Sequence, residues 1–157
     1  MSEKQNNKVF QAFEEIMQYA HFWNWVPDWQ VAKEIYESFP NSYSVLTPFA
    51  YSYLEELIRS TTSEYGIELL DENGQPKKRK VGLGLIKLAK DENIDKNPNY
   101  VKLLKEIEEY FSSSTRSDEG DNRNSVLHGF MHPRYWSDQS FERLIFDIAK
   151  LSQHAGF

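Results

Sequence analysis

The chain has 157 residues, with 18 lysines and arginines against 24 aspartates and glutamates, and a net charge of −6 at pH 7. This length fits one domain that closes its own core, and the negative balance argues against a broadly cationic surface that holds nucleic acid. The sequence contains no cysteine, which excludes disulfides and thiolate metal sites and fits an intracellular compartment.

Apolar runs in the sequence are all shorter than the roughly 18 residues that span a bilayer. The first ten residues, MSEKQNNKVF, lack the apolar core of a secretory signal. We therefore expect a cytoplasmic protein without a membrane partner, with residues 1–157 forming a single domain. Aromatic residues make up 15% of the chain, which indicates a well-filled core or a buried interface.

Three amphipathic helices are expected before residue 60. Apolar residues at helical spacing predict the first over residues 7–21, and Asp28 is expected to cap a second helix that Pro40 ends. Thr47 followed by Pro48 predicts the start of the third, because proline is favoured at the first helical position. One apolar stripe of this helix holds Ala50, Tyr53, Leu54, Leu57 and Ile58.

The pattern then changes between the third and fourth helices. Asn73 followed by Gly74 is a turn signal, so a small hairpin or an irregular excursion is expected near residues 67–82. A short helix is expected over residues 83–90. The excursion contains the one basic cluster of the sequence, which comprises Lys77, Lys78, Arg79 and Lys80. These residues could contact RNA phosphates, but a solvated loop is the favoured interpretation.

Helical signals return in the last third of the chain. Asn97 followed by Pro98 predicts the start of a helix that reaches about residue 111, and residues 112–120 form a polar loop. Ser137 is expected to cap the last amphipathic helix. The elements together predict an all-α fold, an up-and-down bundle of five to six helices.

Between the polar loop and the last helix lies the stretch NRNSVLHGF, residues 122–130. If Asp121 or Asn122 caps a short helix from residue 123, the side chains that share the core face are those of Val126, Leu127 and Phe130.

The remaining side chains of this helix are polar. Asn124 and His128 are four residues apart, so they share a face that turns away from the core. Arg123 instead points toward the apolar face, where a guanidinium needs a carboxylate partner or must reach around the first turn. Glu55 is the expected partner.

An arginine, an amide and a histidine together suit RNA cleavage without a metal. This reaction needs a base for the 2′-hydroxyl, an acid for the leaving oxygen and a cation for the phosphate. Histidine titrates near neutrality and arginine's planar fork fits phosphate oxygens, while an amide can orient the imidazole or the sugar hydroxyl. Since one histidine cannot readily be acid and base on opposite sides of the phosphorus, a two-fold dimer would supply the second.

The run from Arg123 to Gly129, RNSVLHG, resembles the signature of the HEPN superfamily: an arginine, four to six residues of which the first is polar, and a histidine. Residues 51–60, YSYLEELIRS, resemble the earlier core helix of these domains. Residues 137–151 resemble the helix after the signature. The resemblance covers roughly residues 47–152, and only the signature is residue-specific.

The resemblance implies a dimeric helical bundle that acts without a cofactor as a metal-independent endoribonuclease, in a toxin–antitoxin, abortive-infection or other defence system. Arg123 and His128 would be catalytic, Asn124 would support them, Glu55 would help, and the RNA product would carry a 2′,3′-cyclic phosphate. One branch of the family has a tyrosine two positions after the histidine, which a partner nucleotidyltransferase modifies. This chain has Phe130 there, so the resemblance does not extend to that control.

Other interpretations stay open. His128 and His132 have the spacing of two metal ligands, but Gly129 and Pro133 interrupt a helix there, so a metal site is not favoured. The aromatic residues within 21–30 could stack on bases, although packing at a helix corner is favoured. The main alternative is a non-catalytic dimerisation module of the same fold that binds RNA, a nucleotide or a protein, which the acidic net charge favours.

Overall fold

The computed structural model describes residues 3–66, 69–113, 119–129 and 132–157. These ranges contain seven α-helices and two short 3₁₀ helices and no β-strand, so the expected all-α fold is confirmed. The helix count exceeds the expected five to six. The elements are α1 (Glu3–Tyr19), α2 (Val26–Ser38), α3 (Tyr43–Ser60), α4 (Gly82–Asn93), α5 (Pro98–Ile107), η1 (Glu108–Phe111), α6 (Arg123–Leu127), η2 (Pro133–Tyr135) and α7 (Asp138–Ser152).

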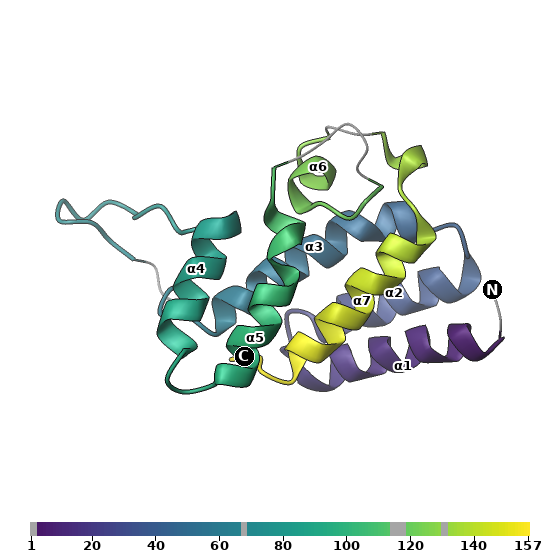
Figure 1. Ribbon diagram of the computed structural model, residues 1–157, viewed down its shortest axis with the longest axis horizontal. Helices are drawn as coiled ribbons and strands as arrows, with labels where there is room; N and C mark the ends of the chain where they lie inside the picture. Colours follow the sequence, from purple (N-terminus) through teal and green to yellow (C-terminus); the bar gives the residue numbers. More distant parts are fainter. Residues whose placement is uncertain (1–2, 67–68, 114–118, 130–131) are drawn as a thin grey trace.

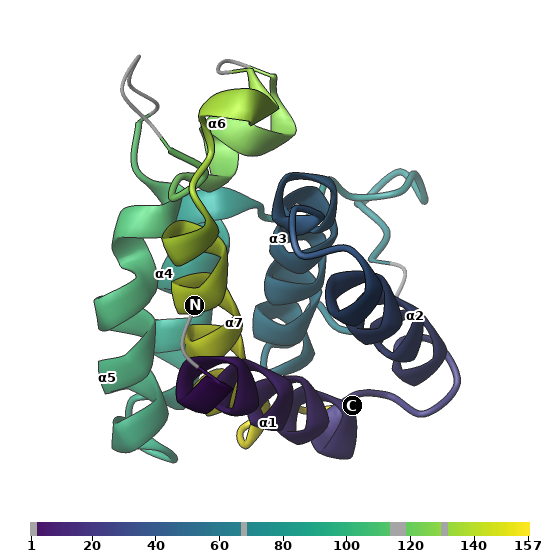
Figure 2. The same ribbon diagram turned by 90° about the vertical axis from the view of Figure 1, so that its right-hand side faces the viewer.

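Helix α3 is the centre of the bundle (Figure 1). It packs against α7 and α4 and carries α6 above it, while α7 also packs against α1, and α1 against α2. The view turned by 90° shows α4 and α5 on one side of α3 and α2 on the other (Figure 2). No helix within the described ranges is both long and apolar enough to cross a membrane.

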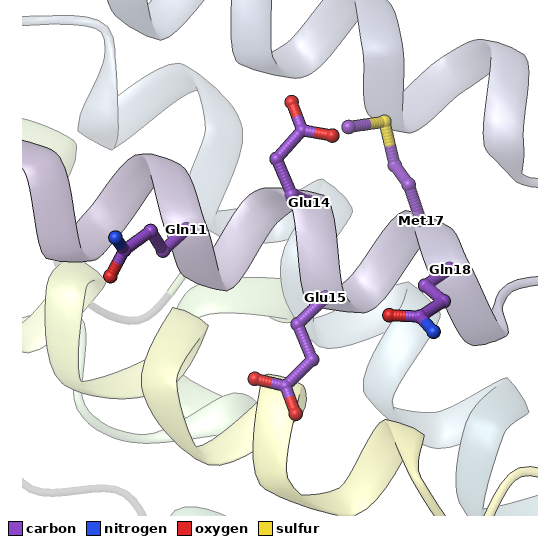
Figure 3. A pocket seen from close by; sticks show the side chains of 5 residues that line it. All are labelled: Gln11, Glu14, Glu15, Met17 and Gln18. Carbon is purple, nitrogen blue, oxygen red and sulfur yellow. The ribbon is translucent and has the colours of Figure 1, made fainter.

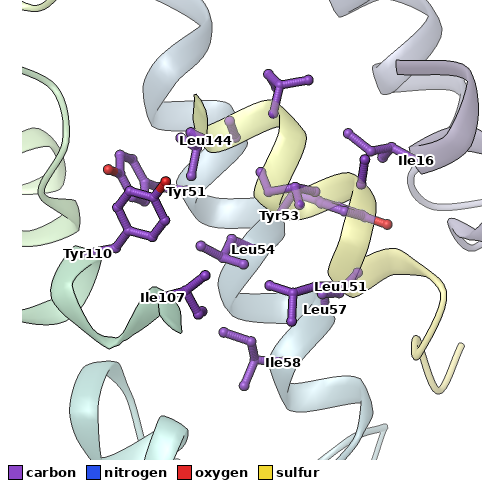
Figure 4. Packing of buried hydrophobic residues seen from close by; sticks show 14 of the residues in the cluster. Ile16, Tyr51, Tyr53, Leu54, Leu57, Ile58, Ile107, Tyr110, Leu144 and Leu151 are labelled. Atoms are coloured by element: carbon purple, nitrogen blue, oxygen red, sulfur yellow. The ribbon is translucent and has the colours of Figure 1, made fainter. Parts of the chain in front are cut away.

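The apolar stripe predicted for α3 is buried in the core, with every one of its five residues 0% exposed. Burial of a leucine or isoleucine side chain contributes about 1.5–3 kcal/mol, so this stripe stabilises the bundle more than helix propensity does. Figure 4 shows the residues of the stripe packed against those of the neighbouring helices, among them Ile16, Ile107, Tyr110, Leu144 and Leu151.

The predicted cap of α2 is wrong. The helix begins at Val26, so Asp28 lies in its first turn, and the N-cap residue Trp25 makes no side-chain capping bond. His21 closes the preceding turn instead. Its Nδ1 accepts hydrogen bonds from the backbone N–H groups of Trp23 and Asn24, both at 3.3 Å, which explains why the helix starts earlier.

The predicted start of α3 is wrong as well, because Pro48 lies inside the helix. The backbone N–H of Leu46 already donates to the carbonyl of Ser42 at 3.0 Å, so the first turn forms before the proline. Proline removes one helical hydrogen bond. Leu46 and Thr47 are both buried, and this burial favours continuing the helix through the proline.

Three other helix starts agree with the sequence. Asn97 caps α5 by accepting from the N–H of Tyr100 at 3.2 Å, and Ser137 caps α7 by accepting from the N–H of Ser140 at 3.1 Å. The third, the start of α6 at Asn122, is described with the site. These caps were predictable because a short polar side chain satisfies N–H groups two or three residues ahead of it.

The excursion near residues 67–82 contains no strand among its described residues. Within residues 69–82 the backbone forms one isolated antiparallel bridge, between Leu70 and Pro76, around a turn in which Gly74 has a φ of 72°. Residues 71–81 are all exposed. We call residues 69–81 the basic arm, which projects from the body of the molecule beside α4 (Figure 1).

Candidate functional site

The site starts with the cap of α6. Asn122 is 3% exposed, and its Oδ1 accepts from the N–H of Ser125 at 3.0 Å, so Asn122 rather than Asp121 is the cap. Its Nδ2 donates to the carbonyl of Ser112 at 2.9 Å and thereby ties α6 to the end of η1. Of the predicted core face, Val126 is buried and Leu127 partly buried. Phe130 lies outside the described residues.

The guanidinium of Arg123 is paired with Glu55, as the sequence predicted. Nε and Nη2 of Arg123 donate to Oε2 of Glu55 at 3.0 and 2.6 Å. The two side chains are only 13% and 10% exposed. Short charge-assisted bonds of this kind orient a guanidinium strongly, so Arg123 has a fixed position at the base of α6.

Asn124 orients the arginine and not the histidine. Its Oδ1 accepts from Nη1 of Arg123 at 3.0 Å, and its Nδ2 donates to the carbonyl of Ser112 at 3.0 Å. Sequence reasoning allowed the amide to orient either the imidazole or a sugar hydroxyl. In this structure both polar atoms of the amide are engaged with other groups.

His128 stands at the other end of α6 and is exposed, as expected from the helical face. Its backbone N–H donates to the carbonyl of Asn124 at 3.1 Å and closes the helix. Gly129 follows with a φ of 65°, a conformation that glycine adopts without strain. The imidazole therefore lies on the surface, at the opposite end of α6 from the residue that carries the guanidinium.

Sequence reasoning missed Arg59. It is 8% exposed, and its Nη2 lies 3.7 Å from Oε1 of Glu55, so that one buried carboxylate stands between two guanidiniums. Nη1 of Arg59 also donates to Oε2 of Glu56 at 3.2 Å. The spacing of four between Glu55 and Arg59 in a helix could have indicated the first of these contacts.

Of the proposed RNA-binding cluster, the four side chains of Lys77 to Lys80 lie on the exposed part of the basic arm. The backbone of Lys80 is held at both polar atoms. Its N–H donates to Oε2 of Glu64 and its carbonyl accepts from Nη2 of Arg59, each at 2.9 Å. The arm thus ends on the same network of charged side chains that holds Arg123.

The aromatic corner is divided between packing and exposure. Trp29 is 1% exposed, and the ring of Trp25 lies 5.0 Å from that of Tyr53, so these two tryptophans pack. Phe22 and Trp23 are 73% and 75% exposed. Beyond α6, Trp136 is buried and Tyr135 is exposed.

Two surface pockets bear on the search for a site. One of about 630 Å³ lies along α1 and contains no residue of the predicted site (Figure 3). Another of about 210 Å³ adjoins the start of α6 and is lined by Glu109, Ser112, Asp121, Asn122 and Arg143. Among the described residues, no group of three or more histidines, aspartates or glutamates is arranged to hold a metal ion.

Comparison of the chain with protein-family models, with curated proteins and with solved structures finds no match in any of the three. What the site can do therefore follows from the chemistry of Arg123, His128 and the groups that hold them.

Proposed function

We propose that the chain is a metal-independent endoribonuclease with a HEPN-like bundle, and that it cleaves RNA to leave 2′,3′-cyclic phosphate ends. The observation that supports this most is the placement of Arg123 and His128 at the two ends of the five-residue helix α6, one oriented and the other exposed. Defence against phage, or the toxin of a toxin–antitoxin pair, is the setting that fits such an activity.

Arg123 retains donors for a phosphate. A guanidinium has five N–H donors, of which three are used in the bonds to Glu55 and Asn124. The remaining two can bind phosphate oxygens, and the pairing with Glu55 orients the fork before the substrate arrives. Stabilisation of developing negative charge by an oriented cation is often a large catalytic contribution.

His128 supplies the proton transfer in this proposal. The exposed imidazole of His128 takes the proton of the 2′-hydroxyl, whose oxygen then attacks the adjacent phosphorus. The leaving 5′-oxygen needs a proton from the opposite side. A second His128, from the other copy in a two-fold dimer, provides it, so the active species is proposed to be a homodimer.

A second candidate is a non-catalytic module of the same fold that binds RNA, a nucleotide or a protein partner, such as an antitoxin or a nucleotidyltransferase. The observation that favours it is the ion pair between Arg123 and Glu55. Glu55 neutralises the charge of Arg123, and only 13% of the Arg123 side chain is exposed, so little of the guanidinium is open to a phosphate.

The experiment incubates the purified full chain with mixed RNA in EDTA and assays the ends for cyclic phosphate. His128→Ala is expected to lower the rate by about 10²–10⁴-fold, the usual contribution of proton transfer. Arg123→Lys should also lower it, because a lysine cannot form the fork. His132→Ala removes a nearby exposed imidazole outside the signature and serves as the matched control.

RNA that stays equally intact with the wild type and all variants would exclude the endoribonuclease. The second candidate would then be tested by RNA binding. Sedimentation of the wild type checks the dimer separately, because a chain that cleaves RNA as a monomer would contradict the shared site.

A further inference from the structure

We propose that Arg59 is a positioning residue, which fixes the basic arm relative to Arg123 so that an RNA strand bound along the arm continues to α6. The inference rests on the proposed function for the identity of the ligand. It adds a residue that the signature does not contain and a direction in which the strand crosses the molecule.

The first step concerns how the arm is attached. Residues 71–81 are exposed, yet the backbone of Lys80 is held on both sides by side chains of the body. The buried Glu64 accepts from its N–H and the buried Arg59 donates to its carbonyl, each at 2.9 Å. The end of the arm next to α4 therefore has a defined position. The three basic residues that precede Lys80 extend outward from this fixed point.

The second step is that the same arginine contacts the site. Glu55 accepts two hydrogen bonds from Arg123 through Oε2, and its Oε1 lies 3.7 Å from Nη2 of Arg59. The contacts run without interruption from the carbonyl of Lys80 through Arg59 and Glu55 to Arg123. A displacement of either guanidinium changes the environment of the carboxylate that both share.

The third step is that stability alone does not explain an arginine at this position. Nε of Arg59 is buried and has no hydrogen-bond partner in the part of the chain that the structure describes, which is unfavourable. An apolar side chain would avoid this cost. Only the planar fork of arginine reaches Glu56 and the carbonyl of Lys80 at once, so the geometry points to attachment of the arm.

The fourth step identifies the ligand as a polyanion. The basic arm carries four cations at residues 77–80 against two carboxylates, Asp71 and Glu72, so it is locally positive in a chain whose net charge is −6. The carboxylate of Asp71 in the same arm is engaged in its own turn, where Oδ1 accepts from the N–H groups of Asn73 and Gln75 at 2.8 and 2.9 Å. A single strand bound at the arm would follow these cations toward Lys80.

The experiment measures binding of a 2′-O-methyl oligonucleotide of about 12 nucleotides, a usual length for a single-strand site, by fluorescence anisotropy. This probe has no 2′-hydroxyl and cannot be cleaved by the proposed reaction. Four proteins form a double-mutant cycle: the wild type, Arg59→Gln, an arm variant and their combination. The arm variant carries Lys77→Gln, Lys78→Gln and Arg79→Gln, and leaves the held residue Lys80 in place.

In the presence of the arm cations, Arg59→Gln should raise the Kd by about three- to tenfold, the range of a typical pairwise coupling. In the arm variant, the same change should alter the Kd by less than about twofold. The arm variant itself should make the salt dependence shallower, by up to about 0.7 in slope for each cation that contacts a phosphate.

Further variants separate positioning from stability. Arg59→Lys keeps the charge but cannot bridge the two acceptors, so it should behave like Arg59→Gln. Glu64→Gln weakens the other contact with Lys80 and should show the same dependence on the arm even if an Arg59 variant fails to fold. Glu56→Gln weakens the other end of the Arg59 fork and should raise the Kd by less than Arg59→Gln does. Glu92→Gln, whose carboxylate accepts from Ser63 and does not hold Lys80, is the control and should leave the Kd unchanged. Thermal unfolding is recorded for each variant.

Three results would overturn the inference: no binding of the probe by the wild type, an arm variant that binds as tightly as the wild type, or an effect of Arg59→Gln that is equal with and without the arm cations. The cleavage assay gives an independent answer. If the chain leaves RNA intact but shows the coupling between Arg59 and the arm, the proposed endoribonuclease activity is contradicted and the positioning role of Arg59 is supported.

Discussion

Glu55 is the residue on which both buried arginines depend. Its carboxylate lies within 2.6 Å of Arg123 and 3.7 Å of Arg59, with side chains that are 10–13% exposed. Removing one partner of a buried ion pair is costly, because the remaining charge loses its compensation without regaining water. The pairing predicts a large effect on stability from a substitution that hardly changes the shape of the side chain.

Glu55→Gln is expected to lower the free energy of unfolding by about 2–4 kcal/mol, since two guanidiniums lose their shared carboxylate. Urea unfolding followed by circular dichroism measures this. The neighbouring Glu56→Gln, whose carboxylate is 30% exposed, is the control and should cost less than about 1 kcal/mol. Equal midpoints for Glu55→Gln and the wild type would show that the pair does not stabilise the fold.

His154 is held in its neutral form by geometry as well as by burial. Oδ1 of Asn97 accepts from the N–H of Tyr100, so the amide turns its Nδ2 toward Nδ1 of His154 at 2.9 Å. Nδ2 can only donate, so Nδ1 must accept and carry no proton. Burial lowers the pKa of His154 from its ordinary value of 6.5.

A lowered pKa means that the folded chain binds fewer protons at this site than the unfolded chain. The stability contributed by neutral His154 is complete above about pH 6.5 and is lost as the pH falls toward the lower folded pKa. The difference in Tm between the wild type and His154→Gln should therefore fall by up to about 2 °C between pH 7.5 and 5.5. A difference that stays constant over this range would contradict the assignment.

At the scale of an element, α6 depends on its cap because it has only five residues. A helix of this length is not stable by itself in water. The side chain of Asn122 both caps the helix and donates to the carbonyl of Ser112. These two bonds, with the burial of Ser125 and Val126, keep the ends of α6 in place.

Asn122→Ala should cost about 1–2 kcal/mol, since it removes the cap of α6 and one of the two side-chain donors to the carbonyl of Ser112, which keeps its bond from Asn124. Asn122→Asp is the matched variant. It keeps the cap but cannot donate to Ser112, so it should recover part of the loss. Chemical denaturation gives both values, and an aspartate variant less stable than the alanine variant would mean that the cap is not the main contribution.

Local signals in the sequence predicted the elements better than their starts. The caps at Asn97, Asn122 and Ser137 act over three residues, and the stripe of α3 follows from helical spacing alone. The start of α3 was missed because burial in the finished bundle outweighs the proline. In the site, Glu55 could be predicted because a guanidinium on an apolar face requires a carboxylate partner. The bond from Arg59 to the main-chain carbonyl of Lys80, 21 residues away, could not, because contact with a backbone carbonyl leaves no pattern in the sequence.

At the scale of the whole molecule, α3 lies at the centre and the basic arm at the edge. Leu54, Leu57 and Ile58 are 0% exposed, whereas residues 71–81 are exposed throughout. Amides in densely packed segments exchange with solvent only through openings that approach global unfolding, and exposed segments exchange at little cost. The bundle should therefore be uneven in local stability along the chain.

Hydrogen exchange followed by mass spectrometry checks this. Amides in the middle of α3 should exchange more than about a thousandfold more slowly than those of the basic arm, given usual stabilities of 5–15 kcal/mol. Addition of the 2′-O-methyl oligonucleotide should slow exchange in the arm and leave α3 unchanged. Arm amides that are as slow as those of α3 without the oligonucleotide would contradict this distribution.

The uneven exposure of the tryptophans gives the chain an optical reporter of its surroundings. Trp23 is 75% exposed, against 1% for Trp29 and 4% for Trp136. The fourth tryptophan, Trp25, is partly buried in the same corner as Trp23. A water-soluble quencher such as acrylamide reaches Trp23 and hardly Trp29 or Trp136, so the quenchable fraction of the emission comes mainly from this corner of the molecule. Any binding partner that covers this corner, a second copy of the chain included, will shift the tryptophan emission to shorter wavelength and protect it from the quencher. Binding there can therefore be followed without a label on the protein.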